Sequence, residues 1–407
     1  MSGPGTGVAN LRTAQAVRER AALVAQAVLR GDSRCFSLDE HRLPEVAALV
    51  AEETRRNYPA LQIPAHSRWR HFVVGGDDRF ERCIAPALAG DARERARASL
   101  DLIVTSVLLD AGAGGAWRYM DRHTGAPLVR SEGLAIASLD LFADGLLSSA
   151  PHGPLRADAE ALCAVETPVL ARAFQVEIAN PLAGLEGRAA LMRSLGDAVA
   201  RRSDLFGGGR PRIGHLFDRF ERIAQGGALS ANTILTTLLD AFAPIWPNGE
   251  SLDGEPLGDV WRHRAAQTAN PPALVPFHKL SQWLCYSVIE SLQRSSVTVV
   301  DTDALTGLAE YRNGGLFVDA GVVRPIDEGA FIATHSPGDE LIVEWRALTV
   351  YLLERLRPLV AEALGLDALP MAQLLQGGTW SAGRRLAYER SPEGSPPFSL
   401  RSDGTVF

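Results

Sequence analysis

The sequence predicts a mainly α-helical protein with a few short strands, and three observations lead to this fold class. Apolar residues recur with helical spacing over the longest regular stretches, which are Leu11–Leu29, Leu43–Asn57, Asp91–Asp110 and Asp339–Ala363. Residues typical of helix ends stand at their boundaries, with Gly31 closing the first stretch and Asp91 placed as an N-cap of the third. Strand-like runs are short, as at Leu316–Val318. We therefore expect a multi-helical protein with one central pocket and no central parallel sheet.

The composition is that of an ordinary soluble globular chain, and it excludes several classes of function. The 407 residues are 46% hydrophobic and 22% charged, which suffices for a large core and two or three lobes. A net charge of −7 argues against a nucleic-acid polymer as the partner. The four cysteines are scattered without a CxxC pair, as in a reduced cytoplasmic protein. The N-terminal stretch lacks the layout of a signal peptide, and no apolar run approaches the roughly 18 residues of a membrane span, so we expect a cytoplasmic protein without membrane contact.

A glycine-rich linker predicts that the chain is built from two lobes. Further helices are expected at Leu134–Leu147, Ile213–Ile223 and Leu229–Phe242. Among them, the run Phe206-Gly-Gly-Gly-Arg210-Pro211 is the clearest linker in the chain. It separates an N-terminal helical lobe, residues 1–206, from a C-terminal helical lobe, residues 207–407. We expect the two lobes to form one integrated unit.

Lys279 is the only lysine in the chain, although lysine and arginine together number 41. Arginine is a flat fork that stays charged in any protein environment, whereas lysine is a compact point charge whose pKa falls on burial. A site that needs a small ammonium or a titratable amine cannot accept arginine. The alternative is that one surface lysine survives here by chance.

The residues around Lys279 favour a functional site over that alternative. From Pro276 the sequence has helical character, with proline near the first turn, where its missing N–H costs nothing. Apolar residues cover most of the helix circumference, and the remaining narrow stripe holds Lys279, Gln282, Trp283, Tyr286 and Glu290. A helix of this kind is buried, so its polar stripe is expected to face a cavity or an internal network. A charge in such a place needs a partner.

Glu310 is the expected partner of Lys279. A short helix is predicted over 304–309, and the Asn313-Gly314-Gly315 turn after it would allow positive φ and close backbone approach to a ligand. Glu310 lies between the two, where a chain reversal exposes a carboxylate. The alternative is a structural ion pair between Glu310 and Arg312.

A second polar cluster occupies the stretch Ile63–Arg82. It contains His66, Arg68, Trp69, Arg70, His71, Asp77 and Asp78. Two arginines flanking a tryptophan on a loop suit an anion or a planar group, and an aspartate pair suits sugar hydroxyls. A solvated charged loop is the alternative. The two histidines have no third ligand at a metal spacing, so no metal and no other cofactor is expected.

Several longer motifs resemble a known family. They are SRWRHF with GGDDR, LLDAGAG with SEGLA, FHKLSQWL, LTGLAEYRNGGLFVD, and the terminal GGTW…GR…SPP…SDGTVF. Together they resemble the uracil-catabolism protein four family over nearly the whole chain. That family belongs to the ring-opening route of uracil degradation, which proceeds through a ribosylurea-type intermediate to urea and a three-carbon acid. The resemblance implies a role in this route.

A more local resemblance bears on the mechanism. The block Phe277–Gln282 and the block from Asp303 to Arg312 look like the two motifs of the queuosine-nucleotide salvage glycosylases. Those all-α proteins are similar to helix-hairpin-helix DNA glycosylases, and they hydrolyse an N-glycosidic bond with a lysine and an aspartate in the pocket. The resemblance covers about an eighth of the chain and implies a helix-hairpin-helix glycosylase-like core. The matching positions are Lys279 and Glu310, and glutamate reaches one methylene further than the aspartate of that family.

These observations predict a hydrolase that cleaves an N-ribosyl bond, of ribosylurea or its 5′-phosphate. Glu310 and Lys279 would be catalytic. The substrate-binding residues would be Arg68, Trp69, Arg70, His71, Asp77, Asp78, His278, Gln282, Tyr311 and Arg312. The partner is then a ribosylated or phosphorylated small molecule, and assembly into a homo-oligomer stays open. Two alternatives also stay open, a non-catalytic protein that binds a uracil-derived nucleotide and hands it on, and an amidohydrolase acting on a ureido intermediate.

Overall fold

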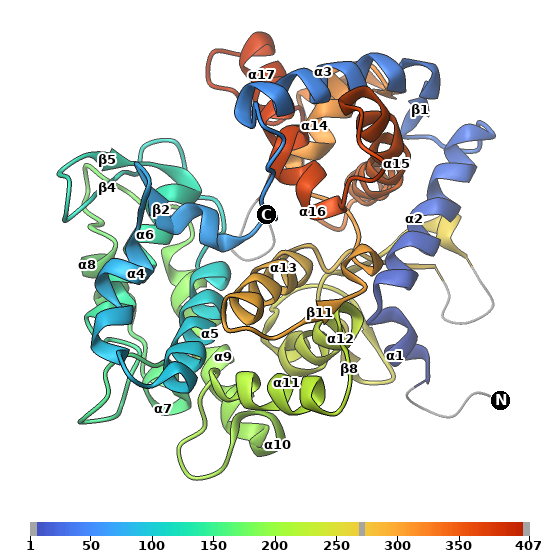
Figure 1. The fold of residues 1–407 in the computed structure, drawn as a ribbon. Helices are drawn as coiled ribbons and strands as arrows, with labels where there is room; N and C mark the ends of the chain where they lie inside the picture. Colours follow the sequence, from blue (N-terminus) through green and yellow to red (C-terminus); the bar gives the residue numbers. More distant parts are fainter. Residues whose placement is uncertain (1–5, 268–272, 402–407) are drawn as a thin grey trace. The chain divides into compact units, whose positions relative to one another are not determined.

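The computed structural model describes residues 6–267 and 273–401, and its backbone is mainly helical with short strands (Figure 1). This confirms the predicted fold class. Contacts divide the described residues into two compact units, each assembled from separate segments. The first unit comprises residues up to His66, Asn248–Gln282 and Asp301–Arg401, and the second comprises Ser67–Pro247 and Trp283–Val300.

This grouping differs from the two lobes, residues 1–206 and 207–407, that the glycine-rich run led us to expect. The glycine run that follows Phe206 lies inside the second unit. Gly207 has a φ of 81°, and a Cβ there would lie 2.7 Å from Nδ1 of His215. Glycine at this position therefore lets the chain turn tightly beneath the histidine ring, which is a packing function inside one unit.

The helices of the first unit begin and end as follows. They are α1 (Thr6–Leu11), α2 (Ala14–Leu29), α3 (Leu43–Asn57), the first turn of α13 (Lys279–Arg294), α14 (Tyr311–Asp319), α15 (Glu340–Leu364), α16 (Met371–Leu374), the π-helical turn η8 (Leu375–Thr379) and α17 (Trp380–Arg390). Single 3₁₀ turns are η1 (Glu40–Arg42), η5 (Arg264–Ala266), η6 (Thr302–Ala304) and η7 (Glu328–Phe331).

The second unit contains the rest of α13 and a further set of helices. They are α4 (Arg79–Cys83), α5 (Ala92–Leu108), α6 (Arg130–Ala143), α7 (Ala159–Cys163), α8 (Thr167–Ala173), α9 (Leu185–Arg201), α10 (Ser203–Phe206), α11 (His215–Gln225) and α12 (Ala231–Phe242). Its 3₁₀ turns are η2 (Arg68–Phe72), η3 (Ala85–Leu88) and η4 (Ala243–Ile245).

The strands of the described residues form two-stranded pairs only. The antiparallel pairs are β1 (Phe36–Leu38) with β12 (Val323–Pro325), β2 (Val73–Val74) with β3 (Asp77–Asp78), β4 (Tyr119–Met120) with β5 (Pro127–Leu128), β7 (Ser251–Leu252) with β8 (Glu255–Pro256), and β9 (Val260–Arg262) with β10 (Leu274–Pro276). The parallel pairs are β6 (Leu229–Ser230) with β11 (Val299–Val300), and β13 (Thr334–His335) with β14 (Ser399–Leu400). None is long enough to organise a core, so packing between helices does so.

The core of the first unit lies where α15 packs against α2 and α3. On α2, Val17, Ala21 and Val24 recur at helical spacing and are buried. The same intervals recur on α15 at Val343, Ala347 and Val350, which belong to the same cluster. Matching apolar stripes of this kind are what the sequence periodicity predicts for facing helices.

The segment after residue 304 differs from the expected short helix, turn and strand. Glu310 instead begins a regular helix, α14, that runs through the Asn313-Gly314-Gly315 stretch and ends at Asp319. A Cβ on Gly314 would lie 2.7 Å from the Trp345 ring, so this glycine permits close approach of α14 to α15. Gly314 serves helix packing, and neither Gly314 nor Gly315 has a positive φ.

The start of α13 also differs from the expectation. Leu274–Pro276 pairs as strand β10, and His278 has a φ of 47°, which turns the chain sharply before the helix begins at Lys279. Lys279 therefore stands in the first turn of α13, where its backbone N–H has no partner within the helix.

Candidate functional site

The N-terminus of α13 is fixed by a buried ion pair that the sequence did not reveal. A carboxylate oxygen of Asp259 accepts the backbone N–H of Lys279 at 3.0 Å. The same carboxylate accepts two hydrogen bonds of 2.7 Å from the guanidinium of Arg346 and one of 2.7 Å from Nε1 of Trp261. Burial by itself would raise the pKa of Asp259, but the Arg346 charge and these hydrogen bonds lower it to about 2. Asp259 is thus a charged cap that positions the lysine backbone.

Gln282, one turn along α13, binds the segment that leads to Glu310. Its Nε2 donates to Oγ1 of Thr306 at 2.6 Å, and its Oε1 accepts the backbone N–H of Thr306 at 2.9 Å. Nε2 also donates to the carbonyl of Phe277 at 3.1 Å. The predicted substrate-binding amide is therefore engaged on both its oxygen and its nitrogen. These contacts hold the first turn of α13 against the segment that leads to Glu310.

Glu310 is half-buried and caps α14. Its carboxylate oxygens accept the backbone N–H groups of Arg312 at 2.8 Å and Asn313 at 2.6 Å. Burial raises the pKa of Glu310, while these two hydrogen bonds and the charge of Lys279 act in the opposite direction. The charge of Lys279 thus acts on Glu310, and both predicted catalytic residues belong to the first unit.

His66 is a third member of this group that the sequence did not single out as a site residue. Burial lowers the pKa of its imidazole, the hydrogen bond of 2.9 Å to Gln376 opposes this, and the charge of Lys279 lowers the pKa further. The charge of Lys279 therefore acts on both His66 and Glu310. The signal available in the sequence was only that His66 opens the Arg/Trp stretch.

The other predicted residues of the first unit take part in packing and hydrogen bonding within the protein. Arg312 is buried, donates to the carbonyl of Gly394 at 2.8 Å, and lies over the Tyr311 ring at 4.8 Å. The expected alternative of an ion pair with Glu310 is replaced by a backbone hydrogen bond. His278 is buried with its Nε2 2.8 Å from the carbonyl oxygen of Leu11, and burial lowers its pKa.

Arg68, one of the two arginines expected to suit an anion, lies fully buried in the second unit. Its guanidinium donates to Asp110 at 2.5 Å and to Oγ of Ser106 at 2.7 Å. The side chain has an exposed fraction of 0%. Burial lowers the pKa of Arg68, and Asp110 opposes that effect. The charge of Arg68 is thus balanced by Asp110, a buried carboxylate of the protein itself.

The neighbouring predicted residues also have partners within the second unit. Arg70 forms an ion pair with Glu290, which accepts a hydrogen bond from Ser67 as well. The ring of His71 lies 6.0 Å from that of Trp283. Its segment forms the 3₁₀ turn η2, where a loop was expected.

The two aspartates of the cluster support the hairpin of β2 and β3. Gly75 and Gly76 turn this hairpin with φ values of 60° and 85°, which only glycine adopts readily. Asp77 pairs with Arg82 at 2.7 Å. Asp78 caps α4 and pairs with Arg294 at 2.8 Å. Both carboxylates thus hold local structure together.

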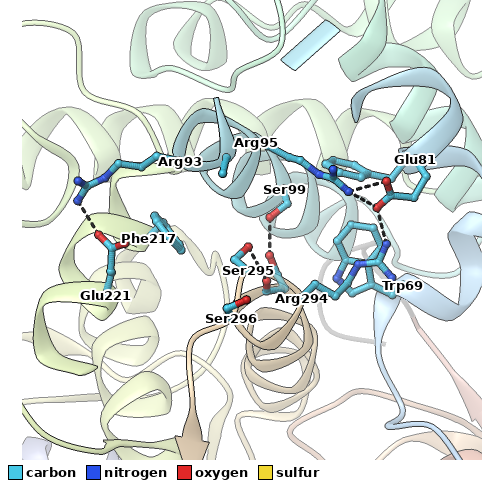
Figure 2. A pocket seen from close by; sticks show the side chains of 13 residues that line it. Trp69, Glu81, Arg93, Arg95, Ser99, Phe217, Glu221, Arg294, Ser295 and Ser296 are labelled. Atoms are coloured by element: carbon cyan, nitrogen blue, oxygen red, sulfur yellow. Dashed lines mark hydrogen bonds and ion pairs between the residues drawn. The ribbon is translucent and has the colours of Figure 1, made fainter. Parts of the chain in front are cut away.

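Trp69 lies at the wall of a pocket of about 500 Å³ in the second unit, which Figure 2 shows from close by. The guanidinium of Arg294 lies 4.3 Å from the centre of its ring. On the same side, Arg95 and Arg294 both donate to Glu81, while Arg93 donates to Glu221 across the pocket (Figure 2). This pocket has a planar wall and arginines already paired with carboxylates.

Among the described residues, no group of three or more histidine, cysteine, aspartate or glutamate side chains is arranged to hold a metal ion. In the same residues, no helix is both long and apolar enough to cross a membrane.

Comparison with known proteins places the chain among relatives of nearly equal length. A family described as a protein of unknown function (DUF1688) matches residues 10–407. The chain is 40% identical to Protein urg3 of Schizosaccharomyces pombe, over 98% of this chain and 99% of that protein. It is 37% identical to Uracil catabolism protein 4 of Lachancea kluyveri, again over 98% of this chain and 99% of the relative. With matches that extend over both polypeptides almost from end to end, this chain belongs to the DUF1688 family.

Proposed function

We propose that this protein acts in uracil catabolism as a hydrolase that cleaves an N-ribosyl bond. The substrate would be ribosylurea or its 5′-phosphate, and the products urea and ribose or its phosphate. The name of the relative Uracil catabolism protein 4 supports the pathway. The observation that carries the reaction type is that Gln282, one turn after the single lysine of the chain, binds Thr306 in the segment that leads to Glu310. The charge of Lys279 also lowers the pKa of Glu310.

The chemistry of N-ribosyl cleavage suits a carboxylate beside an ammonium. The bond from the anomeric carbon to the urea nitrogen breaks through an oxocarbenium-like transition state, and the oxygen of water then bonds to that carbon. Ionised Glu310 would stabilise the cation and accept the water proton. Lys279 would hold Glu310 ionised and donate a proton or hydrogen bond to the departing urea nitrogen. Asp259 and Gln282 would act as positioning residues, because they fix the backbone of Lys279 and the segment before Glu310.

Arg68 and Arg70 are the two arginines expected to suit an anion. Of these two, Arg70 is the more available, because its side chain is 25% exposed and that of Arg68 is 0% exposed. An anion bound at Arg70 would displace its partner Glu290. Loss of Arg68 would instead leave Asp110 buried without its guanidinium.

One observation favours a second candidate, a protein that binds the uracil-derived intermediate and passes it on without chemistry. Both carboxylate oxygens of Glu310 accept N–H groups of α14. A carboxylate used fully as a helix cap has less capacity to act on water. In this case Lys279 would only bind ligand.

Two substitutions of Glu310 separate the candidates, since Glu310→Gln removes the charge and Glu310→Asp keeps both charge and capping oxygens but withdraws them by one methylene. For the hydrolase we expect Glu310→Gln to lower turnover about 10²-fold or more, and Glu310→Asp to lower turnover while thermal stability is retained. Turnover is measured as release of urea and ribose from ribosylurea. Asp91→Asn, which alters the capping carboxylate of α5, is the matched control and should leave turnover unchanged.

The competing outcomes are distinct. Saturable binding of ribosylurea by wild type with no release of urea would establish the binding protein. Wild-type turnover in Glu310→Gln would remove this carboxylate from the reaction.

A further inference from the structure

A second surface pocket of the second unit contains none of the residues predicted from the sequence to be catalytic or substrate-binding. Its volume is about 470 Å³, and it is lined by residues of α5, α10 and α11. The charged groups that matter are Arg93, Arg97, Asp204, Asp218, Arg219 and Arg222. Four arginines and two aspartates give this lining an excess of positive charge.

The two carboxylates of the pocket are already bound by arginines other than Arg219 and Arg222. Asp218 accepts from Nε of Arg93 at 2.8 Å and from two nitrogens of Arg97 at 2.9 Å. Asp204 accepts two hydrogen bonds of 2.9 Å from Arg202. The acidic groups of the lining are therefore matched by Arg93, Arg97 and Arg202.

Arg219 and Arg222 are the unmatched cations. They stand three residues apart on α11, which places them next to each other on one helix face. The charge of Arg219 contributes to lowering the pKa of Asp204. Across residues 6–267 and 273–401, however, the guanidinium groups of Arg219 and Arg222 make no hydrogen bond or ion pair. The Nε atom of Arg219 is itself buried, and a buried N–H group without an acceptor is costly. Both guanidinium groups are therefore available to an anion from outside the protein.

The pocket beside Trp69 provides an internal comparison (Figure 2). There Arg93 pairs with Glu221 at 2.6 Å, and Arg294 pairs with Glu81 at 2.7 Å, while Arg95 also donates to Glu81. Every arginine of that lining has a carboxylate, so an incoming anion would have to displace one. The α11 pocket requires no such exchange.

We propose that the α11 pocket binds the phosphate group of a small molecule, either inorganic phosphate or a phosphate ester. Two adjacent guanidinium forks match the several oxygens and the double charge of a phosphate. Ser203 lines the same pocket and carries a hydroxyl that can act as a further donor. The volume falls in the range typical of small-ligand sites. The net charge of −7 disfavours a nucleic-acid polymer as the source of the phosphate.

This inference does not depend on N-ribosyl cleavage, since it concerns binding alone. The test compares wild type with the double variant Arg219→Gln/Arg222→Gln. A charge-matched control is Arg172→Gln/Arg201→Gln, which removes two exposed arginines of the same unit outside the pocket. Calorimetry and thermal unfolding are measured with inorganic phosphate, with ribose 5-phosphate and with ribose.

We expect phosphate and ribose 5-phosphate to bind and stabilise wild type and the control, and ribose to do neither. The double variant should bind the phosphorylated ligands at least about tenfold more weakly, because hydrogen bonds to charged groups are lost. Equal affinities for the two ligands would assign recognition to the phosphate alone, and tighter binding of ribose 5-phosphate would assign a phosphate ester. If the double variant fails to fold, Arg222→Gln, which alters an exposed side chain, provides the same comparison.

Three results would overturn the proposal. One is the absence of any phosphate-dependent stabilisation of wild type at millimolar ligand. Another is equal phosphate affinity in wild type and the double variant. The third is tighter binding of an RNA oligomer than of either small phosphate, with the same dependence on Arg219 and Arg222.

Discussion

Asp259 and Arg346 are joined by two hydrogen bonds of 2.7 Å, and the same carboxylate accepts the backbone N–H of Lys279. Arg346 lies on α15, the longest helix of the first unit's core, and it also stacks on the Phe277 ring at 4.0 Å. This buried pair therefore links the core helix to the first turn of α13. Loss of the pair between Asp259 and Arg346 is therefore expected to change the position of Lys279.

Replacing Arg346 by methionine tests that link. The Arg346 side chain is 1% exposed, so Arg346→Met would leave Asp259 buried without its cation and lower the free energy of unfolding by about 3–5 kcal/mol. Arg355→Met is the matched control on the same helix. Arg355 is 59% exposed and pairs with Glu40 at 3.3 Å, so its loss should cost about 1 kcal/mol or less. Urea unfolding measures both, and similar losses in the two variants would contradict the structural role of the pair.

The lone lysine makes a sharp prediction about charge geometry. Lys279→Arg keeps the positive charge but adds bulk and a planar fork, which would move the charge by more than an ångström. Misplacement of about that size can lower a rate by on the order of a hundredfold. We expect Lys279→Arg and Lys279→Met to fold and to be nearly inactive in urea release. Normal turnover in Lys279→Arg would show that any cation suffices at this position.

The pKa of Glu310 predicts a pH dependence that reports on Lys279. Because burial raises the folded-state pKa above its ordinary value of 4.5, the folded protein holds this proton more tightly than the unfolded chain. Glu310 therefore favours the folded state at low pH, and this contribution is lost as pH rises from 4.5 through the folded-state pKa. Lys279 lowers that pKa, so Lys279→Met should extend the loss to higher pH.

The measurement is the free energy of unfolding against pH for four proteins. They are wild type, Lys279→Met, Glu310→Gln and the double variant Lys279→Met/Glu310→Gln. Lys279→Met should no longer change the pH dependence of the free energy of unfolding once Glu310 is replaced by glutamine. A shift that persists in the double variant would have another titrating group as its source.

Two adjacent glycines of α14 should respond oppositely to alanine. At Gly314 a Cβ would meet the Trp345 ring at 2.7 Å and Oγ1 of Thr349 at 2.8 Å, so Gly314→Ala should destabilise by about 1–3 kcal/mol. At Gly315 the nearest atom is Cδ of Pro397 at 3.4 Å. Gly315→Ala should therefore be neutral or stabilise the helix by up to about 1 kcal/mol. Thermal unfolding of the two variants decides whether helix packing or turn formation requires these glycines.

The sequence predicted what depends on local chemistry. The helix Leu43–Asn57 has the predicted bounds, because its apolar periodicity is regular and the chain turns at the following Tyr58-Pro59. Asp91 caps α5 as expected, accepting the backbone N–H of Glu94 at 2.9 Å. The pairing of Lys279 with Glu310 arose from a local motif resemblance and the rarity of lysine, and it stays a prediction.

The differences arise where a residue's role is set by a partner distant in the chain. Two successive glycines suggest a turn, and only Trp345 and Thr349 on another helix reveal that Gly314 is a packing contact. The Arg68 side chain suggests an anion site until Asp110 is seen to neutralise it. In the same way, Arg219 and Arg222 attract no notice in sequence, because their distinction is the absence of a carboxylate partner among the described residues.

The interleaved composition of the two units has a consequence for biosynthesis. The segment Ser67–Pro247 can begin to pack while the ribosome is still adding the rest, whereas α2 and α3 must wait for α15, which lies almost 300 residues downstream of α3. At roughly 5–20 residues per second, that wait lasts on the order of 15–60 seconds. During it, the apolar faces of α2 and α3 stay without their native cover, which makes the nascent N-terminal region a natural client for chaperones. A premature stop before α15 would leave those faces permanently uncovered, so truncated products are expected to aggregate or be degraded.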